Sequence, residues 1–141
     1  MKLLPVLLAL AAGGMTVQAV AAGGAIAVKL GNPTRAEIAA LKRAFASEGA
    51  NELPVSVGHA DLNGDHRPDL IFSSENRDYC GALGCDSGAI LATPGGYSPR
   101  LIHLATSFDP IFVLPAVHNG MHDIRYGNAR HAFMWDGKQY Q

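Results

Sequence analysis

A nine-residue segment in the first half of the chain, DLNGDHRPD at positions 61–69, constrains the fold more than any other. It crowds three carboxylates and one amide into one short stretch, and the apolar run 70–72 follows at once. Neighbouring carboxylates repel one another unless hydrogen bonds or a cation compensate their charge. The segment therefore predicts a tight loop that leads directly into a buried strand.

Oxygen donors recur at alternating positions of this loop, which we call the acidic loop (61–69). The donors are the side chains of Asp61, Asn63, Asp65 and Asp69 and the main-chain carbonyl of Arg67. Donors at this spacing converge on one point when the backbone curls, and Ca²⁺ takes about six to eight oxygen ligands. The pattern predicts a calcium site made of these five residues.

The acidic loop is not a complete EF-hand. His66 stands where an EF-hand has glycine, and Phe72 stands where it has a bidentate glutamate. Histidine tolerates the left-handed backbone that this position needs better than most residues. We expect weak affinity, on the order of 10⁻⁴ to 10⁻³ M, and a structural role for the ion. An acidic surface turn without metal is the alternative, because Asn-Gly-Asp is also ordinary turn chemistry.

The first 19 residues have the pattern of a secretory signal peptide. Lys2 is their only charged residue, an apolar run occupies 3–12, and small residues stand at Val17 and Ala19. The apolar run is too short to span a bilayer. The sequence predicts a periplasmic or secreted protein without a membrane anchor after cleavage, followed by a glycine-rich flexible leader at 20–33.

The charge balance argues against one class of partner. The chain has 11 lysines and arginines and 12 acidic residues, so loss of Lys2 with the signal leaves 10 against 12, a net charge near −2. No basic stripe is available to neutralise phosphates, which excludes a typical nucleic-acid binder. The remaining length suits one domain at 34–141.

The rest of the chain predicts a mainly β (α+β) fold. Thr34 and Glu37 form a capping-box pattern, and an apolar stripe follows it at helical spacing, so we expect one short N-terminal helix at about 34–48. After Pro54 short apolar segments alternate with turn signals such as Asn119-Gly120, which indicates an antiparallel sheet or sandwich. Strands are expected near 55–57, 70–72, 89–91, 101–104, 111–114, 123–126 and 132–135.

Two cysteines, Cys80 and Cys85, are separated by four residues. In an exported protein such a pair indicates a disulfide, whereas a redox centre more often has two intervening residues and zinc needs two further ligands. The disulfide is expected to rigidify a protruding loop at 73–87 that could bind a partner. The candidate contact residues are Tyr79, Leu83 and Asp86 on this loop and Asn119 and His122 on the later turn.

Histidines raise the alternative of a hydrolase. His118 and His122 are four positions apart, but Asn119 and Gly120 would interrupt a helix that aligned them. The glutamate of a zinc-protease motif and the Gly-x-Ser-x-Gly elbow of serine hydrolases are both missing. A site made of His118, His122 and Asp123 would therefore have to be assembled by the fold, and the sequence predicts no catalytic residues.

The order of these motifs resembles a group of small bacterial periplasmic β proteins, some of which are similar to periplasmic lysozyme inhibitors and to immunity proteins against lysozyme-like effectors. The resemblance covers about 34–141 and implies a non-enzymatic, calcium-binding protein whose partner is a lysozyme-like enzyme. A calcium-stabilised envelope module without inhibitory role is the second hypothesis, and the hydrolase is the third. The matching segments are the predicted helix, DLNGDHRPDLI, CGALGC, PIFVL, NGMHDI and WDGKQY.

Overall fold

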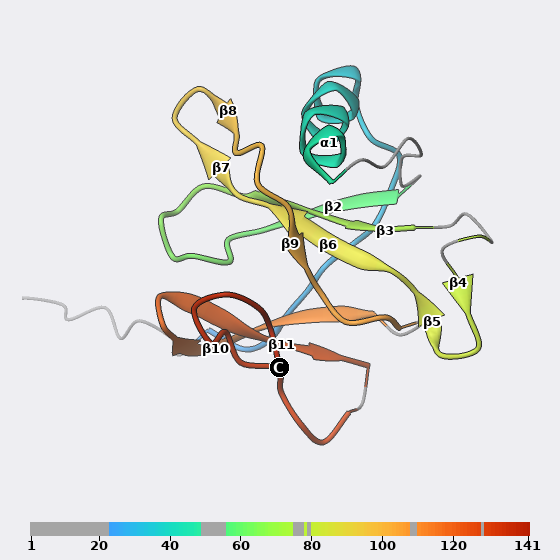
Figure 1. Ribbon diagram of the computed structural model, residues 1–141. Coiled ribbons are helices and arrows are strands. Elements are labelled where there is room, and N and C mark those ends of the chain that lie inside the picture. The colour runs from blue at the N-terminus through green and yellow to red at the C-terminus, as the bar shows by residue number, and fades with distance from the viewer. Residues whose placement is uncertain (1–22, 49–55, 75–77, 79, 108–109, 128) are drawn as a thin grey trace, which may run out of the picture.

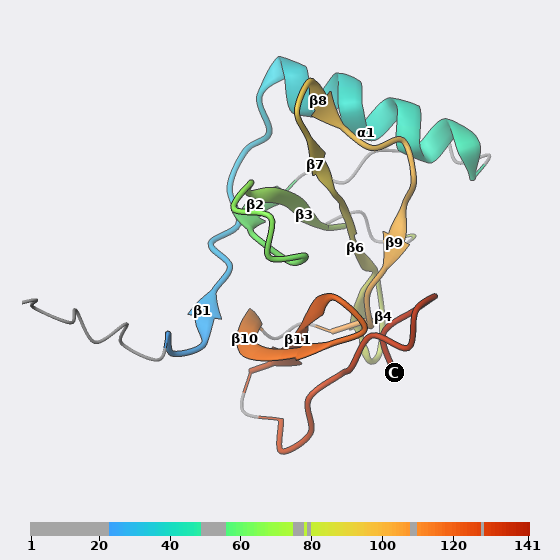
Figure 2. The ribbon, with the colours of Figure 1, turned by 90° about the vertical axis from the view of Figure 1, so that its left-hand side faces the viewer.

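The chain folds into three layers. The structure is a computed structural model that describes residues 23–48, 56–74, 78, 80–107, 110–127 and 129–141. Helix α1 (Arg35–Ser47) covers one face of a central four-stranded sheet, and a three-stranded sheet covers the other face (Figures 1 and 2). The prediction of a mainly β fold with antiparallel sheets and one short helix is confirmed for the described residues.

Helix α1 begins where the capping box predicts. Thr34 is the N-cap, its hydroxyl accepts from the Glu37 N–H at 3.3 Å, and a Glu37 carboxylate oxygen accepts from the Thr34 N–H at 2.6 Å. These two bonds satisfy N–H groups that the first helical turn leaves without partners. Leu41 and Ala44 are buried on the sheet side, as the apolar stripe predicts.

The central sheet is antiparallel, with its strands in the order β2-β3-β6-β9. Successive side chains of a strand point to opposite faces, so Leu70 and Phe72 pack under the helix while Ile71 packs toward the other sheet. Strand β3 is therefore buried on both faces, which explains its uninterrupted apolar run. The strands are β2 (Ser56–Ala60), β3 (Asp69–Ser73), β6 (Ser87–Ile90) and β9 (Ile102–His103).

The second sheet has the order β1-β10-β11 and packs on the central sheet through the larger core cluster, which includes Ile71, Ile124 and Trp135. Asn119 and Gly120 join β10 to β11 with φ of 49° and 82°, the positive values that a tight hairpin turn needs. Its strands are β1 (Ile26–Ala27), β10 (Ile111–His118) and β11 (Met121–Tyr126).

Two small hairpins extend from this framework. One is formed by β4 (Cys80–Gly81) and β5 (Gly84–Cys85), the other by β7 (Ala92–Thr93) and β8 (Gly96–Tyr97). The strand expected at 132–135 is reduced to isolated bridges, Phe133 with Ile124 and Trp135 with Tyr140. These bridges still fix the C-terminal segment on the core.

The prediction of a flexible leader at 20–33 is wrong for residues 26–31. Ile26 and Ala27 pair with β10, Val28 is only 6% exposed, and Gly31 exchanges two backbone hydrogen bonds with Val57 at 2.7 and 2.8 Å. The segment thus runs from the outer sheet to the central sheet (Figure 2). It can pass there because Gly58 has no side chain; a Cβ at that position would lie 2.6 Å from the Lys29 carbonyl oxygen.

The predicted signal peptide at 1–19 lies outside the described residues. Within the described part of the chain, no helix has both the length and the apolar character needed to cross a membrane.

Candidate functional site

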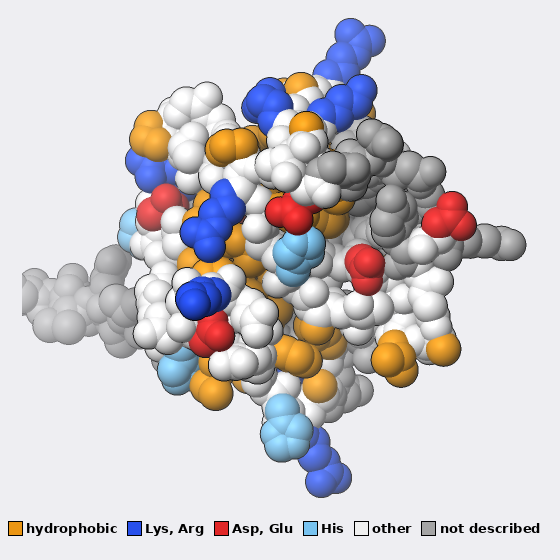
Figure 3. Space-filling model, viewed as in Figure 1, with side chains coloured by type: hydrophobic (Ala, Val, Ile, Leu, Met, Phe, Trp, Pro, Cys, Tyr) orange, Lys and Arg blue, Asp and Glu red, His pale blue; other side chains and the backbone are white. Residues whose placement is uncertain are grey.

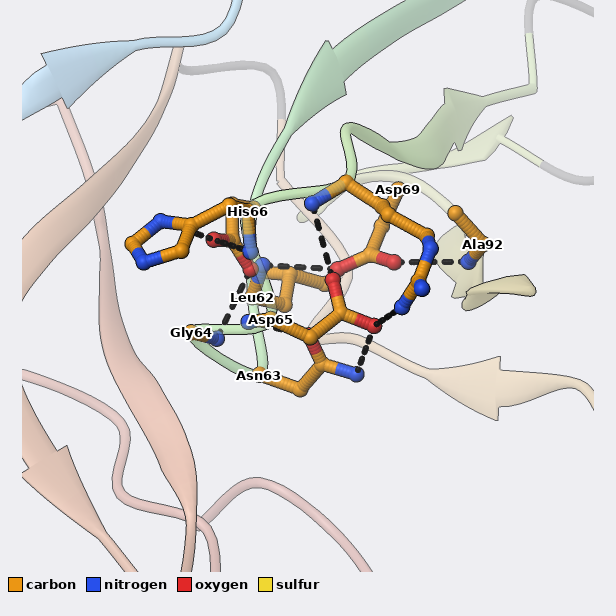
Figure 4. Close-up of polar contacts among 9 residues, drawn as sticks. Leu62, Asn63, Gly64, Asp65, His66, Asp69 and Ala92 are labelled. Atoms are coloured by element: carbon orange, nitrogen blue, oxygen red, sulfur yellow. Dashed lines mark hydrogen bonds and ion pairs between the residues drawn. The ribbon is translucent and has the colours of Figure 1, made fainter. Parts of the chain in front are cut away.

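The acidic loop curls around its own carboxylates. The two Asp61 oxygens accept hydrogen bonds from the N–H groups of Gly64 at 2.7 Å and His66 at 2.8 Å (Figure 4). Gly64 and His66 have φ of 72° and 65°, so histidine adopts the left-handed backbone expected for it. The backbone therefore turns its N–H groups inward, where they compensate part of the loop's negative charge.

Asp65 is held by the residues on either side of it. Its carboxylate accepts from the Arg67 N–H at 2.8 Å and from the Arg67 guanidinium at 3.1 Å, and Asn63 donates to it at 3.3 Å. The backbone hydrogen bond from Arg67, helped by the guanidinium and by Asn63, holds the pKa of Asp65 below its usual value. The charged form of this half-buried acid is thus favoured at neutral pH.

Asp69 differs from the other two acids because it is fully buried. One oxygen accepts from the Leu62 N–H and the other from the Ala92 N–H, both at 2.7 Å (Figure 4). Burial raises the pKa of Asp69, the charges of Asp61 and Asp65 add to the rise, and the two N–H groups oppose it without cancelling it. Asp69 therefore joins the acidic loop to β7 through a carboxylate whose charge is costly to keep.

The structure brings the five predicted calcium donors into one loop but does not gather their carboxylates. Among the described residues, no three acidic, histidine or cysteine side chains lie close enough together to hold a metal ion. Asp69 is turned to Leu62 and Ala92, while Asp65 is turned to Arg67. The oxygen donors of the loop are of the type that binds Ca²⁺. In this structure the carboxylates instead accept hydrogen bonds from groups of the loop itself and from β7.

The predicted disulfide is present and closes a very short hairpin. Cys80 and Cys85 are bonded and stand directly opposite each other in the β4–β5 pairing. Leu83, at the tip, is 85% exposed, the highest value among the exposed large hydrophobic residues of the described chain. Asp86 is exposed beside the hairpin and accepts from the Thr106 hydroxyl at 2.9 Å. Tyr79, the remaining candidate contact on this loop, lies outside the described residues.

The residues of the hydrolase hypothesis are only partly brought together. His118 Nδ1 lies 2.7 Å from a carboxylate oxygen of the buried Asp123. His122 Nδ1 donates instead to the Leu114 carbonyl at 2.8 Å, so His122 is held on the backbone of β10. The pair of His118 and Asp123 resembles the histidine and its orienting carboxylate in a catalytic triad, but His122 does not extend it.

One partly buried contact was missed by the sequence interpretation. Glu37 Oε1 lies 2.6 Å from His59 Nε2, so the residue that caps the helix also binds the central sheet. The sequence interpretation assigned Glu37 to the capping box alone. A contact between Glu37 and a residue of β2 depends on the tertiary fold, and no local sequence pattern indicates it.

Comparison of the chain with protein-family models, with curated proteins and with solved structures finds no match. The expected relationship to periplasmic lysozyme inhibitors therefore stays a prediction, and a functional assignment rests on the geometry of this chain.

Proposed function

We propose that this protein is an exported, non-enzymatic binding module whose disulfide-closed hairpin (80–85) enters a concave site on a partner protein. The observation that carries the proposal is the 85% exposure of Leu83 at the tip of that hairpin. An apolar side chain at the tip of a rigid, protruding loop gains contact area when it is buried in an apolar pocket of a partner protein.

The hairpin is suited to this role because its ends cannot separate. The Cys80–Cys85 bond joins residues that are already paired, and the Cys85–Ser107 bridge fastens the base to the neighbouring segment. A loop that is rigid before binding loses less conformational entropy when it binds. Figure 1 shows the hairpin at the edge of the molecule, and Figure 3 shows hydrophobic side chains protruding there.

The charges beside the hairpin indicate which partner surface fits. Asp78 and Asp86 are exposed before and after it in sequence. A pocket with an apolar floor and a basic rim complements an apolar tip with acidic neighbours. A lysozyme-like enzyme with a basic surface around its cleft is the partner that we propose, in line with the resemblance of the sequence.

Calcium binding by the acidic loop is the second part of the proposal. Asp61, Asn63 and Asp65 supply oxygen donors on a loop with the required left-handed turns, and Arg67 and Asp69 complete the predicted ligand set. On binding, Ca²⁺ would replace the Arg67 guanidinium as the positive partner of the Asp65 carboxylate. Its contribution would be to hold β2 and β3 together, not to take part in chemistry.

Inhibition assays test the hairpin. The purified protein is mixed with a panel of lysozyme-like muramidases, and cell-wall lysis and complex formation on gel filtration are measured. We expect inhibition of at least one enzyme and its loss in Leu83→Asp. Val117→Asp is the matched control, because Val117 is 53% exposed on β10 and should tolerate the same charge without loss of binding.

Two outcomes would contradict the binding proposal. The first is the absence of inhibition and complex formation across the panel, which would favour the structural envelope module. The second is equal inhibition by the wild type and Leu83→Asp, which would place the contact elsewhere. Hydrolysis of cell wall or peptide by the protein alone, abolished in His118→Ala, would instead support the hydrolase alternative.

A further inference from the structure

A hollow of about 220 Å³ opens between β9, the β10–β11 turn and the C-terminal segment. Its floor is apolar and is formed by Leu91, Ile102, Met121 and Trp135. Figure 3 shows hydrophobic side chains recessed on this face with basic side chains beside them. We call this hollow the Trp135 pocket. It is smaller than the roughly 300–1,000 Å³ of sites for drug-sized ligands, so it suits an occupant of about one amino-acid residue.

The walls of the Trp135 pocket are fixed before any ligand arrives. Asn119 donates from its side-chain amide to the Trp135 carbonyl at 2.8 Å, which ties the β10–β11 turn to the C-terminal segment. The Trp135 ring packs on Tyr140 with 5.3 Å between centroids, and the Tyr140 hydroxyl donates to the His122 carbonyl at 2.8 Å. A pocket held in this way binds with little reorganisation.

Arg100 is the charged residue among those lining the Trp135 pocket. Its backbone N–H donates to the Ser98 hydroxyl at 3.1 Å, and the Ser98 N–H donates to the Leu91 carbonyl at 2.8 Å, so the base of the side chain is anchored at the rim. Within the described chain, the Arg100 guanidinium forms no ion pair with a carboxylate. Its charge is therefore available to a ligand.

The acid nearest in sequence to the lining residues does not neutralise Arg100. Asp136 precedes the lining residue Gly137, but its carboxylate accepts from the N–H groups of Lys138 at 2.7 Å and Gln139 at 2.8 Å within its own turn. Among its lining residues, the pocket thus combines an apolar floor with one basic side chain, Arg100.

We propose that the Trp135 pocket binds an α-carboxylate that carries a compact apolar side chain. The guanidinium of Arg100 would take the carboxylate in a bidentate contact, and the apolar side chain would lie on Trp135 and Met121. This chemistry occurs in a free N-acylated amino acid and at the C-terminus of a peptide. The proposal does not depend on the hairpin at 80–85, because the two sites share no residue.

Fluorescence of Trp135 gives a direct readout, because it is the single tryptophan of the chain. The probes are N-acetyl-leucine, the peptide acetyl-Gly-Gly-Leu and the amidated form of each, which lacks the carboxylate. We expect both acids to change the fluorescence saturably, with Kd of about 1 mM or lower, and both amides to bind at least about tenfold more weakly. A peptide that binds much more tightly than N-acetyl-leucine identifies a peptide C-terminus as the occupant, and equal binding identifies the free acid.

Variants of exposed arginines complete the test. Arg100→Gln should weaken binding of the acids about tenfold, and the affinity of Arg100→Lys should lie between that of Arg100→Gln and that of the wild type. Arg130→Gln is the control, because Arg130 is exposed and does not line the pocket, and it should bind the acids as the wild type does. The proposal is overturned if the acids give no saturable change, if acids and amides bind equally, or if Arg100→Gln binds as the wild type does. A response to N-acetylglucosamine that Arg100→Gln leaves intact, without a response to the acids, would also overturn it.

Discussion

The carboxylate of Asp69 accepts a hydrogen bond from the backbone N–H of Ala92 at 2.7 Å, across 23 positions of sequence. Its second oxygen holds the N–H of Leu62 in the same way. Asp69 therefore connects the acidic loop to β7.

Replacing this connection should be costly. We expect Asp69→Ala to lower the free energy of unfolding by about 3 kcal/mol, because two backbone N–H groups lose their partner where water has little access. Urea unfolding measures the change. Asp136→Ala is the control, since Asp136 also accepts from two N–H groups but is exposed, so water can replace it. Equal losses in the two variants would show that Asp69 has no special structural role.

Calcium should stabilise the protein if the proposed site forms. With an affinity of about 10⁻⁴ to 10⁻³ M, Ca²⁺ at about 10 mM would add roughly 1.4 to 2.7 kcal/mol to the free energy of unfolding. Thermal melts with Ca²⁺, with Mg²⁺ and with chelator measure this effect, and Asp61→Asn should reduce it. A melt that is the same in Ca²⁺ and in chelator would rule the site out.

Glu37 should make stability depend on acid pH. Burial alone would raise the pKa of Glu37, but hydrogen bonds with Thr34 and the contact with His59 outweigh it and hold the pKa below its usual value of 4.5. The stabilisation is therefore complete above the usual value and is lost as pH falls through the lowered pKa.

Unfolding between about pH 6 and pH 3 tests this dependence. The difference in stability between wild type and Glu37→Gln should shrink as pH falls, at no more than about 1.4 kcal/mol per pH unit for one proton. Glu48→Gln removes a glutamate at the exposed end of the same helix, where its contact to His103 is longer at 3.6 Å, and is the matched control. A difference for Glu37→Gln that does not change with pH would contradict the argument.

Local patterns predicted local structure well. The capping box at Thr34, the hairpin turn at Asn119 and the left-handed backbone at His66 each depend on residues a few positions apart, and each is present. The disulfide between Cys80 and Cys85 belongs to the same group, since its partners are close in sequence.

Features that depend on distant partners could not be predicted. The Asp69 contact with Ala92 and the Glu37 contact with His59 depend on which strands become neighbours, and alternation of apolar residues does not specify this. The ordered part of the leader fits the same explanation, because Val28 and Gly31 are placed by pairing partners far along the chain.

Truncation of the leader tests whether its ordered part is needed. A variant that lacks 20–24 should melt like the mature protein, whereas one that lacks 20–31 should melt at least about 5 °C lower, because both sheets lose a paired segment and Val28 leaves the core. Equal melting temperatures would show that residues 26–31 contribute little. We propose that residues 1–19 are cleaved on export, so sequencing of the wild-type protein recovered outside the cytoplasm should give an N-terminus at or near residue 20, upstream of β1.

Removing the disulfide should affect binding more than folding. Closing so short a loop contributes about 2 kcal/mol by the chain-entropy estimate, so the double variant Cys80→Ser with Cys85→Ser should remain folded in the cold. Its inhibition of the partner should fall by more than that of Val117→Asp, because Leu83 is no longer held at a fixed tip. Full inhibition by the double variant would show that rigidity of the hairpin is unnecessary.

Strand β3 faces a core on each side, with Leu70 under the helix and Ile71 under the outer sheet. Two adjacent positions of one strand therefore report on different layers of the molecule. If the layers unfold as one cooperative unit, all spectroscopic signals of a variant have the same unfolding midpoint. This holds whether the side chain at position 70 or the one at position 71 is shortened to alanine. The helix and the outer sheet, which are separated by the central sheet, then have no independent stability. Damage to either one propagates to the other through the central strands, because β6 is shared in the same way, with Ala89 in one cluster and Ile90 in the other.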